Sequence, residues 1–324
     1  MGEFDLITRY FKRPTRRAAL GIGDDCALLQ PRPGTQIAIS SDMLVEGRHF
    51  FADVDPRSLG HKSLAVNLSD LAACGAKPLA FTLALALPKV NEPWLAEFAR
   101  GLFELADAHD CELIGGDTTA GPLNICITVF GEVPVINGKS QALLRSGAKA
   151  GDDLYVSGTL GDARLALEVF RGGASLSAAE FAAVRQRMER PTPRVALGVA
   201  LRGVAHAAAD VSDGLLGDLG HILTASGVGA ELRLTDIHNS IAVTPILKSA
   251  GACFLPDFVL NGGDDYELVF TAPVSARADV LQAANLAQTP VTRIGTVTIG
   301  PGLVLLDAQG QPVALSSRSF DHFA

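Results

Sequence analysis

Six short segments place an aspartate beside glycine, serine or a second aspartate, usually where an apolar run ends. Two negative charges about 4 Å apart repel by about 4 kcal/mol at an effective dielectric constant near 20. Such segments can therefore converge only if cations lie among them or some carboxyl groups stay protonated. Each alone is typical of an ordinary turn, but six together favour a shared site. The segments are Gly21-Ile-Gly-Asp-Asp25, Ser40-Ser-Asp42, Asn67-Leu-Ser-Asp70, Gly115-Gly-Asp117, Asp210-Val-Ser-Asp213 and Gly262-Gly-Asp-Asp265.

The composition narrows the class of protein. A length of 324 residues favours two domains, each large enough for its own core. The formal net charge of −8 argues against a nucleic-acid partner, because such proteins usually carry a basic stripe. The densest basic run is Lys12-Arg-Pro-Thr-Arg-Arg17, which we expect to be a solvated loop. Aspartate and serine oxygens are hard ligands that suit Mg²⁺ or Ca²⁺.

The cysteines and the apolar runs indicate the cellular compartment of the protein. The five cysteines are odd in number and never in C-x-x-C spacing, which speaks against zinc and disulfide frameworks. The first residues lack the pattern of a signal peptide, and no run approaches the 18 apolar residues that a membrane span needs. We therefore expect a cytoplasmic protein with reduced thiols and no membrane partner.

Apolar periodicity predicts alternating helices and strands in both halves. Residues 123–133 should form a strand that pairs with the strand at 111–114 through the turn at 118–122. Residues 195–208 should form a helical run ahead of Asp210. Gly, Ser, Lys and Arg cluster between Pro134 and Asp153, so the domain boundary is placed there. The other expected helices are 4–11, 56–76, 91–109, 161–170, 177–190, 214–226, 241–250 and 274–285, and the other expected strands are 37–40, 79–87, 154–157, 230–234, 266–271, 292–298 and 303–306.

Several familiar catalytic motifs are absent. Asn137-Gly-Lys-Ser140 resembles the end of a P-loop, but Val133 stands where the first glycine is required. Gly21-Ile-Gly23 is not completed to a dinucleotide fingerprint, because the sixth position is Cys26. No H-R-D kinase loop and no G-x-S-x-G elbow occur. The remaining pattern, carboxylates beside glycines, fits phosphoryl transfer, which needs positioning and charge neutralisation.

Five separated motifs resemble the signatures of the thiamine-monophosphate kinase family. They occur in order along essentially the whole chain and are Gly21-Ile-Gly-Asp-Asp-Cys-Ala27, Ala65-Val-Asn-Leu-Ser-Asp-Leu-Ala-Ala73, Leu113-Ile-Gly-Gly-Asp-Thr-Thr119, Asp210-Val-Ser-Asp-Gly-Leu215 and Gly262-Gly-Asp-Asp-Tyr-Glu-Leu268. The resemblance implies ATP-dependent, Mg²⁺-assisted phosphorylation of thiamine monophosphate to thiamine diphosphate. It also implies an α/β (α+β) fold of the aminoimidazole ribonucleotide synthetase type. Residues 1–145 would bind ATP and Mg²⁺ and form a β-barrel across a homodimer, and residues 146–324 would form a C-terminal α/β domain.

The resemblance assigns roles to individual residues. The Mg²⁺ ions would be held by Asp25, Ser40, Ser41, Asp42, Asp70, Asp117, Asp210 and Asp213. Of these, Asp42, Asp117 and Asp210 would be catalytic. ATP would contact Gly116, Asp117, Arg145 and Ser212. The thiamine phosphate would contact His49, Asp264 and Phe320. Three positions depart from the family pattern, which often has Thr at 41, Glu at 264 and an aromatic residue with a polar tip at 320.

We expect direct in-line transfer to the terminal phosphate oxygen of thiamine phosphate, which is ionised near neutral pH and needs no strong base. Other enzymes of the same superfamily are the first alternative. A selenophosphate synthetase would need a reactive cysteine near the N-terminus, and no cysteine precedes Cys26. A hydrogenase-maturation relative would need a C-terminal cysteine, but the chain ends in His322-Phe-Ala324. A non-catalytic Ca²⁺- or Mg²⁺-binding protein is the second alternative, and no EF-hand-type loop supports it.

Overall fold

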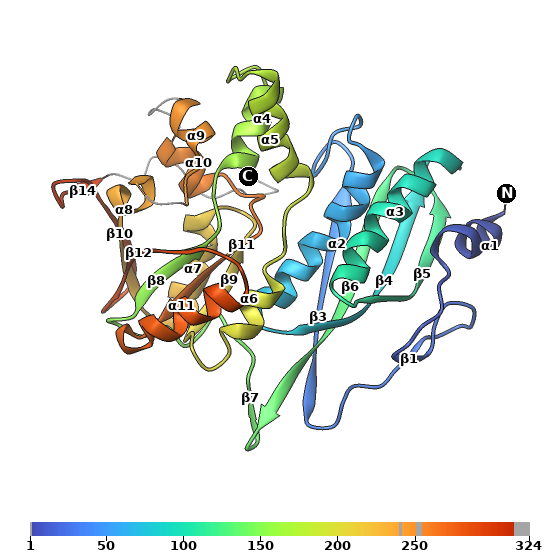
Figure 1. The fold of residues 1–324 in the computed structure, drawn as a ribbon, viewed down its shortest axis with the longest axis horizontal. Coiled ribbons are helices and arrows are strands. Elements are labelled where there is room, and N and C mark those ends of the chain that lie inside the picture. The colour runs from blue at the N-terminus through green and yellow to red at the C-terminus, as the bar shows by residue number, and fades with distance from the viewer. Residues whose placement is uncertain (1, 240–241, 251–254, 314–324) are drawn as a thin grey trace. The chain divides into compact units, whose positions relative to one another are not determined.

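The computed structural model describes residues 2–239, 242–250 and 255–313, and its internal contacts divide the chain into two units (Figure 1). The N-terminal unit comprises Met1–Leu71 and Ala76–Gln141, and the C-terminal unit comprises Ala72–Gly75 and Ala142–Ala324. Each unit is described by itself. The domain boundary between residues 145 and 146 stays a prediction.

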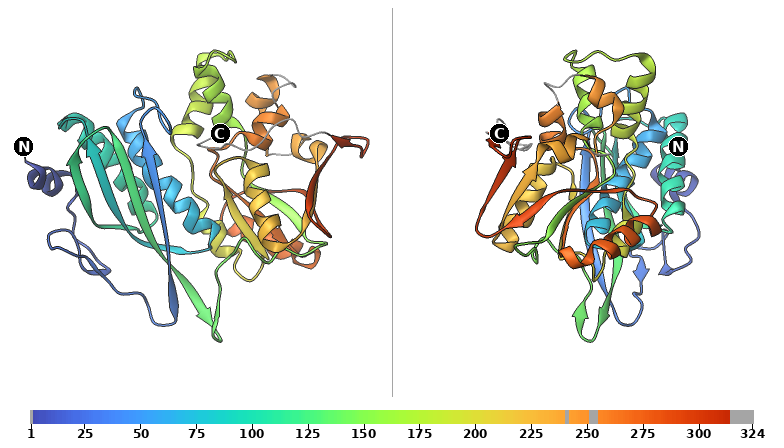
Figure 2. Two further views of the ribbon diagram at one scale, coloured as in Figure 1. Left: turned by 180° about the vertical axis from the view of Figure 1, so that it is seen from behind. Right: turned by 60° about the vertical axis from the view of Figure 1, so that its left-hand side comes forward.

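The N-terminal unit is built from helices and one main sheet. The helices are α1 (Glu3–Leu6), the π-helical turn η1 (Ile7–Phe11), α2 (Pro56–Ala73) and α3 (Glu92–Ala108). The strands are β1 (Ala18–Leu20), β2 (Leu28–Leu29), β3 (Thr35–Val45), β4 (Lys77–Leu87), β5 (Glu112–Ala120), β6 (Asn124–Ile136) and β7 (Lys139–Ser140). Two views show α2 and α3 on the same face of the sheet (Figures 1 and 2).

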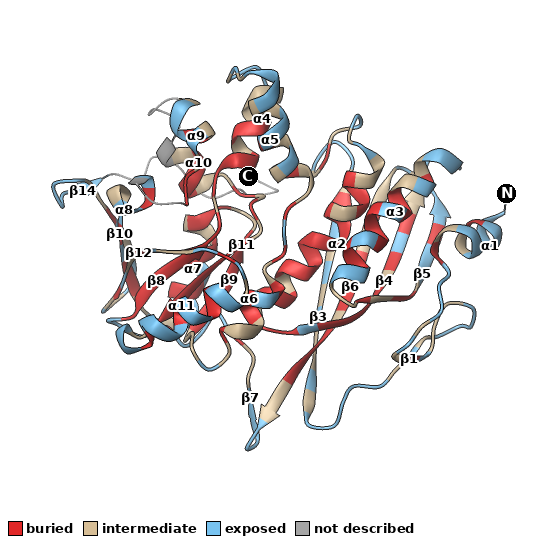
Figure 3. Cartoon of the chain, in the orientation of Figure 1, coloured by how far each residue is buried: buried red, intermediate tan, exposed pale blue. Residues whose placement is uncertain are grey.

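The strand order β3-β6-β4-β5 gives the sheet one buried and one open face. Successive side chains of a strand point to opposite faces. Strand β4 is mostly buried (Figure 3). Along it, Phe81, Leu83 and Leu85 are buried, whereas Ala84 is exposed. The same alternation on β3 leaves Ile39 and Met43 exposed. The helix-covered face therefore forms the core, and the opposite face stays open in the single chain.

The predicted pairing of the strand at 123–133 with the strand at 111–114 is wrong. β6 pairs antiparallel with β3 and β4, and β5 pairs parallel with β4. The helix α3 connects β4 to β5 as a parallel crossover, which places these two strands side by side. The chain then passes over the end of β4, where Gly121 N–H donates to Leu87 O at 2.9 Å, and returns on the other side of β4.

Within its described residues, the C-terminal unit has one mixed sheet of seven strands. The strands are β8 (Asp153–Ser157), β9 (Ala207–Val211), β10 (Gly229–Arg233), β11 (Glu267–Ala272), β12 (Val291–Thr298), β13 (Gly302–Leu306) and β14 (Pro312–Val313). Their order is β14-β13-β10-β12-β8-β11-β9. The helices are α4 (Asp162–Phe170), α5 (Ala178–Glu189), α6 (Val195–Ala200), α7 (Leu215–Ser226), α8 (Leu234–Asn239), α9 (Pro245–Ala250), α10 (Leu255–Asn261), the 3₁₀ turn η2 (Val274–Ala276) and α11 (Arg277–Leu286).

The predicted helical run at residues 195–208 is wrong in its second half. Helix α6 ends at Ala200, and the alanines at 207–209 belong to the buried strand β9. Alanine favours helix locally, but here the ladder to β11 and burial of every residue of β9 decide the outcome. The mixed α/β architecture is confirmed, and a barrel shared by two copies stays a prediction. Among the described helices, none combines the length and apolar character needed to cross a membrane.

Candidate functional site

Strand β3 and helix α2 bring together three of the predicted metal ligands. The Ser40 hydroxyl donates a hydrogen bond to the Asp70 carboxylate. Two residues along β3, the backbone N–H of Asp42 donates to Asn67 Oδ1 at 3.1 Å. Asn67 is held in turn by its Nδ2 group, which donates to Ser63 O at 3.0 Å. One turn of α2 therefore fixes both Ser40 and Asp42 at the helix-covered face of the sheet.

Ser41 and Asp117 lie on the opposite, open face. Ser41 alternates with Ser40 and Asp42 along β3, and its Oγ atom lies 3.0 Å from Thr128 Oγ1. Asp117 on β5 is exposed and pairs in register with the exposed Ala84. Alternation along the strands therefore separates Ser41 and Asp117 from Asp42 by the thickness of the sheet.

The two proposed catalytic aspartates of this unit are also on distant strands. Asp42 lies on β3 and Asp117 on β5, with β6 and β4 between them. Three inter-strand spacings of about 4.8 Å amount to about 14 Å. Within the described ranges, no group of three or more His, Cys, Asp or Glu side chains could hold one metal ion. The unit thus presents its acidic segments at separate points of the sheet.

Gly116 shows why glycine precedes this aspartate. Its φ angle is +141°, and a Cβ atom at this position would stand 1.8 Å from Leu83 O. Only glycine allows β5 to approach β4 this closely. Gly116 therefore sets the position of Asp117 on the strand.

Asp25 and His49 occupy loops of the same unit. Asp25 is exposed in the connection between β1 and β2, and its N–H donates to Asp24 Oδ1 at 2.9 Å. His49 is half-buried, and its Nδ1 accepts the N–H of Val45 at 3.0 Å. A neutral His49 ring consequently carries its proton on Nε2, where it can donate to an anionic group.

In the C-terminal unit, Asp210 is buried at the end of β9, and the turn that follows it is held by Asp218. The backbone N–H groups of Ser212 and Asp213 both donate to Asp218 Oδ2 at 3.0 Å. Burial raises the pKa of Asp218 to about 7, and the charge of Asp213 adds to the rise. The two N–H groups and the positive charge of Arg145 oppose it. Arg145 therefore acts electrostatically on this turn.

Arg145 belongs to an exposed loop whose backbone is held by Ser226 on α7. Ser226 Oγ donates to Arg145 O at 3.1 Å and accepts the N–H groups of Gly147 and Ala148, also at 3.1 Å. The loop is fixed while the guanidinium group stays exposed to solvent. A planar, exposed guanidinium on a fixed backbone is suited to bind a phosphate group.

The turn that carries Asp264 packs directly on the Asp210–Asp213 turn. The N–H of Asp264 donates to Ser212 O at 2.7 Å, and the N–H of Tyr266 donates to Val211 O at 2.9 Å. Asp264 has a φ of +61°, an unusual conformation for a residue with a side chain. The structure thus brings Asp210, Ser212, Asp213 and Asp264 together. Phe320 lies outside the described residues.

A cavity of about 380 Å³ adjoins this region within the C-terminal unit. Asp162 lines it, and the preceding Gly161 N–H donates to both carboxylate oxygens of Asp265 at 3.0 Å. Burial raises the pKa of Asp162, although hydrogen bonds from Thr244 and Thr159 oppose the rise. The hydrogen bonds of Gly161 therefore connect the wall of the cavity to the turn that carries Asp264 and Asp265. The lining residues are Thr159, Asp162, Ala183, Val184, Gln186, Arg187, Arg190, Thr192, Thr244 and Ile246.

Sequence reasoning missed several residues that hold the site in place. Glu267 is fully buried and receives hydrogen bonds from Ser157, Arg187 and Arg194. In its motif, Gly262-Gly-Asp-Asp-Tyr-Glu-Leu268, the family resemblance assigns a role to Asp264 and none to Glu267. Asp218 follows Asp213 by five residues and Ser212 by six, a spacing that lets its carboxylate accept the N–H groups of the preceding turn. That spacing alone could have indicated its role.

Comparisons with known proteins agree over the whole chain. The family model described as AIR synthase related protein, N-terminal domain, matches residues 23–133, and the corresponding C-terminal domain model matches residues 149–307. The thiamine-monophosphate kinase of Salmonella typhimurium strain LT2 is 45% identical over 328 residues, which cover 100% of this chain and 98% of that protein.

Two solved structures extend the comparison. The crystal structure of thiamine-monophosphate kinase from Stenotrophomonas maltophilia K279a is 44% identical, with a TM-score of 0.82 and 96% of both chains covered. AaThiL complexed with AMPPCP and TMP is 28% identical, with a TM-score of 0.77, and the match covers 91% of this chain and 89% of that one.

Proposed function

This chain belongs to the thiamine-monophosphate kinase family, and on that basis we propose that it transfers the γ-phosphoryl group of ATP to thiamine monophosphate, giving thiamine diphosphate. The observation that carries the proposal is the similarity over the full length of both chains. A relative complexed with AMPPCP, an analogue of ATP, together with TMP supports the same pair of substrates.

The donor chemistry of the N-terminal unit fits Mg²⁺. Ser40, Asp42 and Asp70 offer hydroxyl and carboxylate oxygens, the ligands that Mg²⁺ prefers. We propose that these residues hold Mg²⁺ together with Asp25, Ser41, Asp117, Asp210 and Asp213. Bound Mg²⁺ would neutralise the charge of the polyphosphate. The separate positions of Asp42 and Asp117 support several ions rather than one.

The chain's own residues would orient the two anionic substrates. We propose that Gly116, Asp117, Arg145 and Ser212 contact ATP, with the exposed guanidinium group of Arg145 on its phosphates. In its neutral form, the His49 ring carries its proton on Nε2, and this N–H would donate to the phosphate of thiamine monophosphate. The acceptor oxygen is already ionised near neutral pH, so in-line attack needs no strong general base from the protein.

The substrate side of the site is proposed around Asp264 and Phe320. Asp264 is fixed by its hydrogen bond to Ser212 O, which couples the substrate turn to the turn that carries Asp213. The adjoining cavity, with the carboxyl of Asp162 and the hydroxyl of Thr244, offers donors and acceptors to a heterocyclic amine.

We propose that two copies associate through the open face of the N-terminal sheet. Ile39 and Met43 on β3 are 63% and 53% exposed on this face, which also carries the exposed Ala84 on β4. Apolar residues grouped on one face are typical of an interface. Met43→Asp should convert a dimer to a monomer in light scattering, and a wild-type chain that is already monomeric would contradict the association. A cytoplasmic location stays a prediction.

Chromatographic detection of thiamine diphosphate after incubation with ATP, Mg²⁺ and thiamine monophosphate tests the function. Asp42→Asn and Asp117→Asn should each lower the rate at least about 100-fold, because each removes an anionic ligand without changing side-chain volume. Circular dichroism should show an unchanged fold for both. A near-normal rate at saturating Mg²⁺ in either variant would contradict that residue's role.

A further inference from the structure

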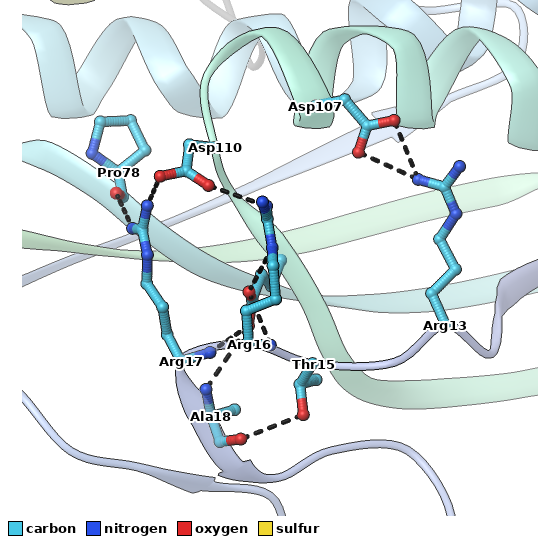
Figure 4. Close-up of polar contacts among 9 residues, drawn as sticks. Arg13, Thr15, Arg16, Arg17, Ala18, Pro78, Asp107 and Asp110 are labelled. Atoms are coloured by element: carbon cyan, nitrogen blue, oxygen red, sulfur yellow. Dashed lines mark hydrogen bonds and ion pairs between the residues drawn. The ribbon is translucent and has the colours of Figure 1, made fainter.

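A basic segment near the N-terminus is held at several points by carboxylates elsewhere in the N-terminal unit. We call residues 12–18 the arginine strap. Residues 12–17 form a loop with exposed Lys12, Arg13 and Arg16, as the sequence predicts, but the arginines of this loop are paired with carboxylates. Figure 4 shows Arg16 and Arg17 both directed to Asp110, and Arg13 directed to Asp107. The strap therefore lies against the end of α3 and the start of β5.

The strongest anchor of the strap is Glu112, the first residue of β5. Its carboxylate accepts backbone N–H groups from Arg16 at 2.9 Å, Arg17 at 3.1 Å and Ala18 at 3.4 Å. Burial alone would raise the pKa of Glu112, but these three N–H groups and the charge of Arg16 bring the pKa below its usual value. The Glu112 side chain is only 9% exposed. Because backbone groups supply these bonds, the carboxylate fixes the path of the chain itself.

Side-chain contacts of the strap are more exposed than the Glu112 anchor. Arg16 Nη2 lies 2.8 Å from Asp110 Oδ1, and the two side chains are 70% and 46% exposed. Arg13 Nη1 donates to both oxygens of Asp107 at 3.1 Å. Exposed ion pairs of this kind add little to stability, so Glu112 is the principal anchor.

The arginine strap also packs against the loop that carries Asp25. A Cβ atom on Gly21 would stand 2.6 Å from Thr15 Cγ2, and one on Gly23 would stand 2.9 Å from Lys12 Nζ. Beyond Gly21 the chain runs directly to Asp25. At the other end of the strap, Ala18 is buried against the sheet in a cluster with Leu79, Ala80 and Ile114. Movement of the strap would therefore displace the Asp25 loop.

We propose that Glu112 is a positioning residue that holds the Asp25 loop in a fixed position relative to Asp117. Asp117 lies five residues after Glu112 on the same strand, β5. This inference rests on the proposed function, which gives both aspartates a role toward Mg²⁺ and nucleotide. Strand β5 is the common support, because it begins with the anchor of the loop and carries Asp117 directly. Without the Glu112 carboxylate, the Asp25 loop would become ordered only when Mg²⁺ and nucleotide bind. The cost of ordering the loop would then weaken the binding of both.

Glu112→Gln tests this inference, because it removes the charge and keeps the size of the side chain. The Mg²⁺ concentration for half-maximal rate and the KM for ATP should rise about tenfold, while kcat changes less than about threefold. Hydrogen exchange provides a second readout. In the wild type, Mg²⁺ with AMPPCP should slow the exchange of residues 21–27, and in the variant this protection should require about tenfold more Mg²⁺.

Two further variants complete the experiment. Asp110→Asn removes the charge that pairs with Arg16 and Arg17, and asparagine tolerates the φ of +52° at this position. It should raise the Mg²⁺ requirement in the same direction but less, and it carries the test if Glu112→Gln does not fold. Glu92→Gln is the matched control, because Glu92 pairs at 2.7 Å with Arg9 outside the strap. The control should match the wild type in every measurement.

Faster amide exchange at residues 16–18 with an unchanged Mg²⁺ requirement would overturn the inference and leave the strap a purely structural feature. A loss confined to kcat would also overturn it. If the wild type forms no thiamine diphosphate, the proposed function fails. The Mg²⁺-dependent protection of residues 21–27 then decides the positioning role separately.

Discussion

Glu267→Gln should strongly destabilise the C-terminal unit. The Glu267 side chain is fully buried, and its carboxylate accepts hydrogen bonds from Ser157 Oγ at 2.6 Å, Arg194 Nε at 2.6 Å and Arg187 Nη2 at 3.0 Å. Glutamine preserves the volume and one acceptor oxygen. It removes the negative charge and turns an amide group toward one of the arginines, so two poorly hydrated guanidinium groups lose their counter-ion.

The expected loss follows from this burial. Removing one partner of a buried ion pair typically costs about 3–5 kcal/mol, because the remaining charge is left uncompensated. The retained acceptor places Glu267→Gln near the lower end, at about 3 kcal/mol. With a urea m-value of about 2 kcal/mol/M, the unfolding midpoint should fall by about 1.5 M.

A matched variant separates burial from charge removal. Glu189 pairs with Arg185 at 2.7 Å in an i,i+4 arrangement on α5, where the two side chains are 12% and 26% exposed. Such helical pairs contribute about 0.5 kcal/mol, so Glu189→Gln should shift the midpoint by only about 0.3 M. Circular dichroism is the suitable probe, because Trp94, the only tryptophan, lies in the N-terminal unit. Equal midpoints for the two variants would refute the account of the Glu267 cluster.

Two further predictions concern glycine positions and pH. Gly116→Ala should prevent stable folding, because its Cβ atom would stand 1.8 Å from Leu83 O. Gly220→Ala within α7 has no atom within reach of its Cβ. It should raise the free energy of unfolding by about 1 kcal/mol in the same denaturation assay. Burial holds the pKa of Asp265 well above its ordinary value, so the folded state binds the proton more tightly than the unfolded chain. Stability should therefore fall as pH rises above about 4, the unfolded pKa. Asp265→Asn should flatten that fall in urea midpoints measured from pH 4 to 7, and an unchanged slope would contradict the assignment.

Strand and helix positions were largely predictable where periodicity and turn residues agreed. The strand at 79–87 and the helix at 91–109 follow from apolar period and from Asn91, whose side chain accepts the N–H of Trp94 at the start of α3. The alanines at 207–209 favour helix by propensity, yet they form a strand because β11 and the core surround them. Such tertiary effects are invisible in a local window.

Arrangement in space was harder to predict than element type. Nothing in the local sequence shows that β6 lies between β3 and β4, because that order depends on which strands the helical crossovers place side by side. Likewise, Arg16 and Arg17 resemble any basic loop until Asp110 and Glu112, about 95 residues later, are seen to bind them. The aspartate motifs themselves were identifiable. Their distribution over two faces of one sheet and over two units depends on strand register.

Phosphorus NMR of the folded wild-type chain with ATP, Mg²⁺ and thiamine monophosphate tests the central claim most directly. We predict that the γ-phosphorus signal of ATP disappears while two coupled signals of thiamine diphosphate grow at the same rate as ADP. Formation of ADP and inorganic phosphate without thiamine diphosphate would contradict the claim, as would the absence of any ATP turnover.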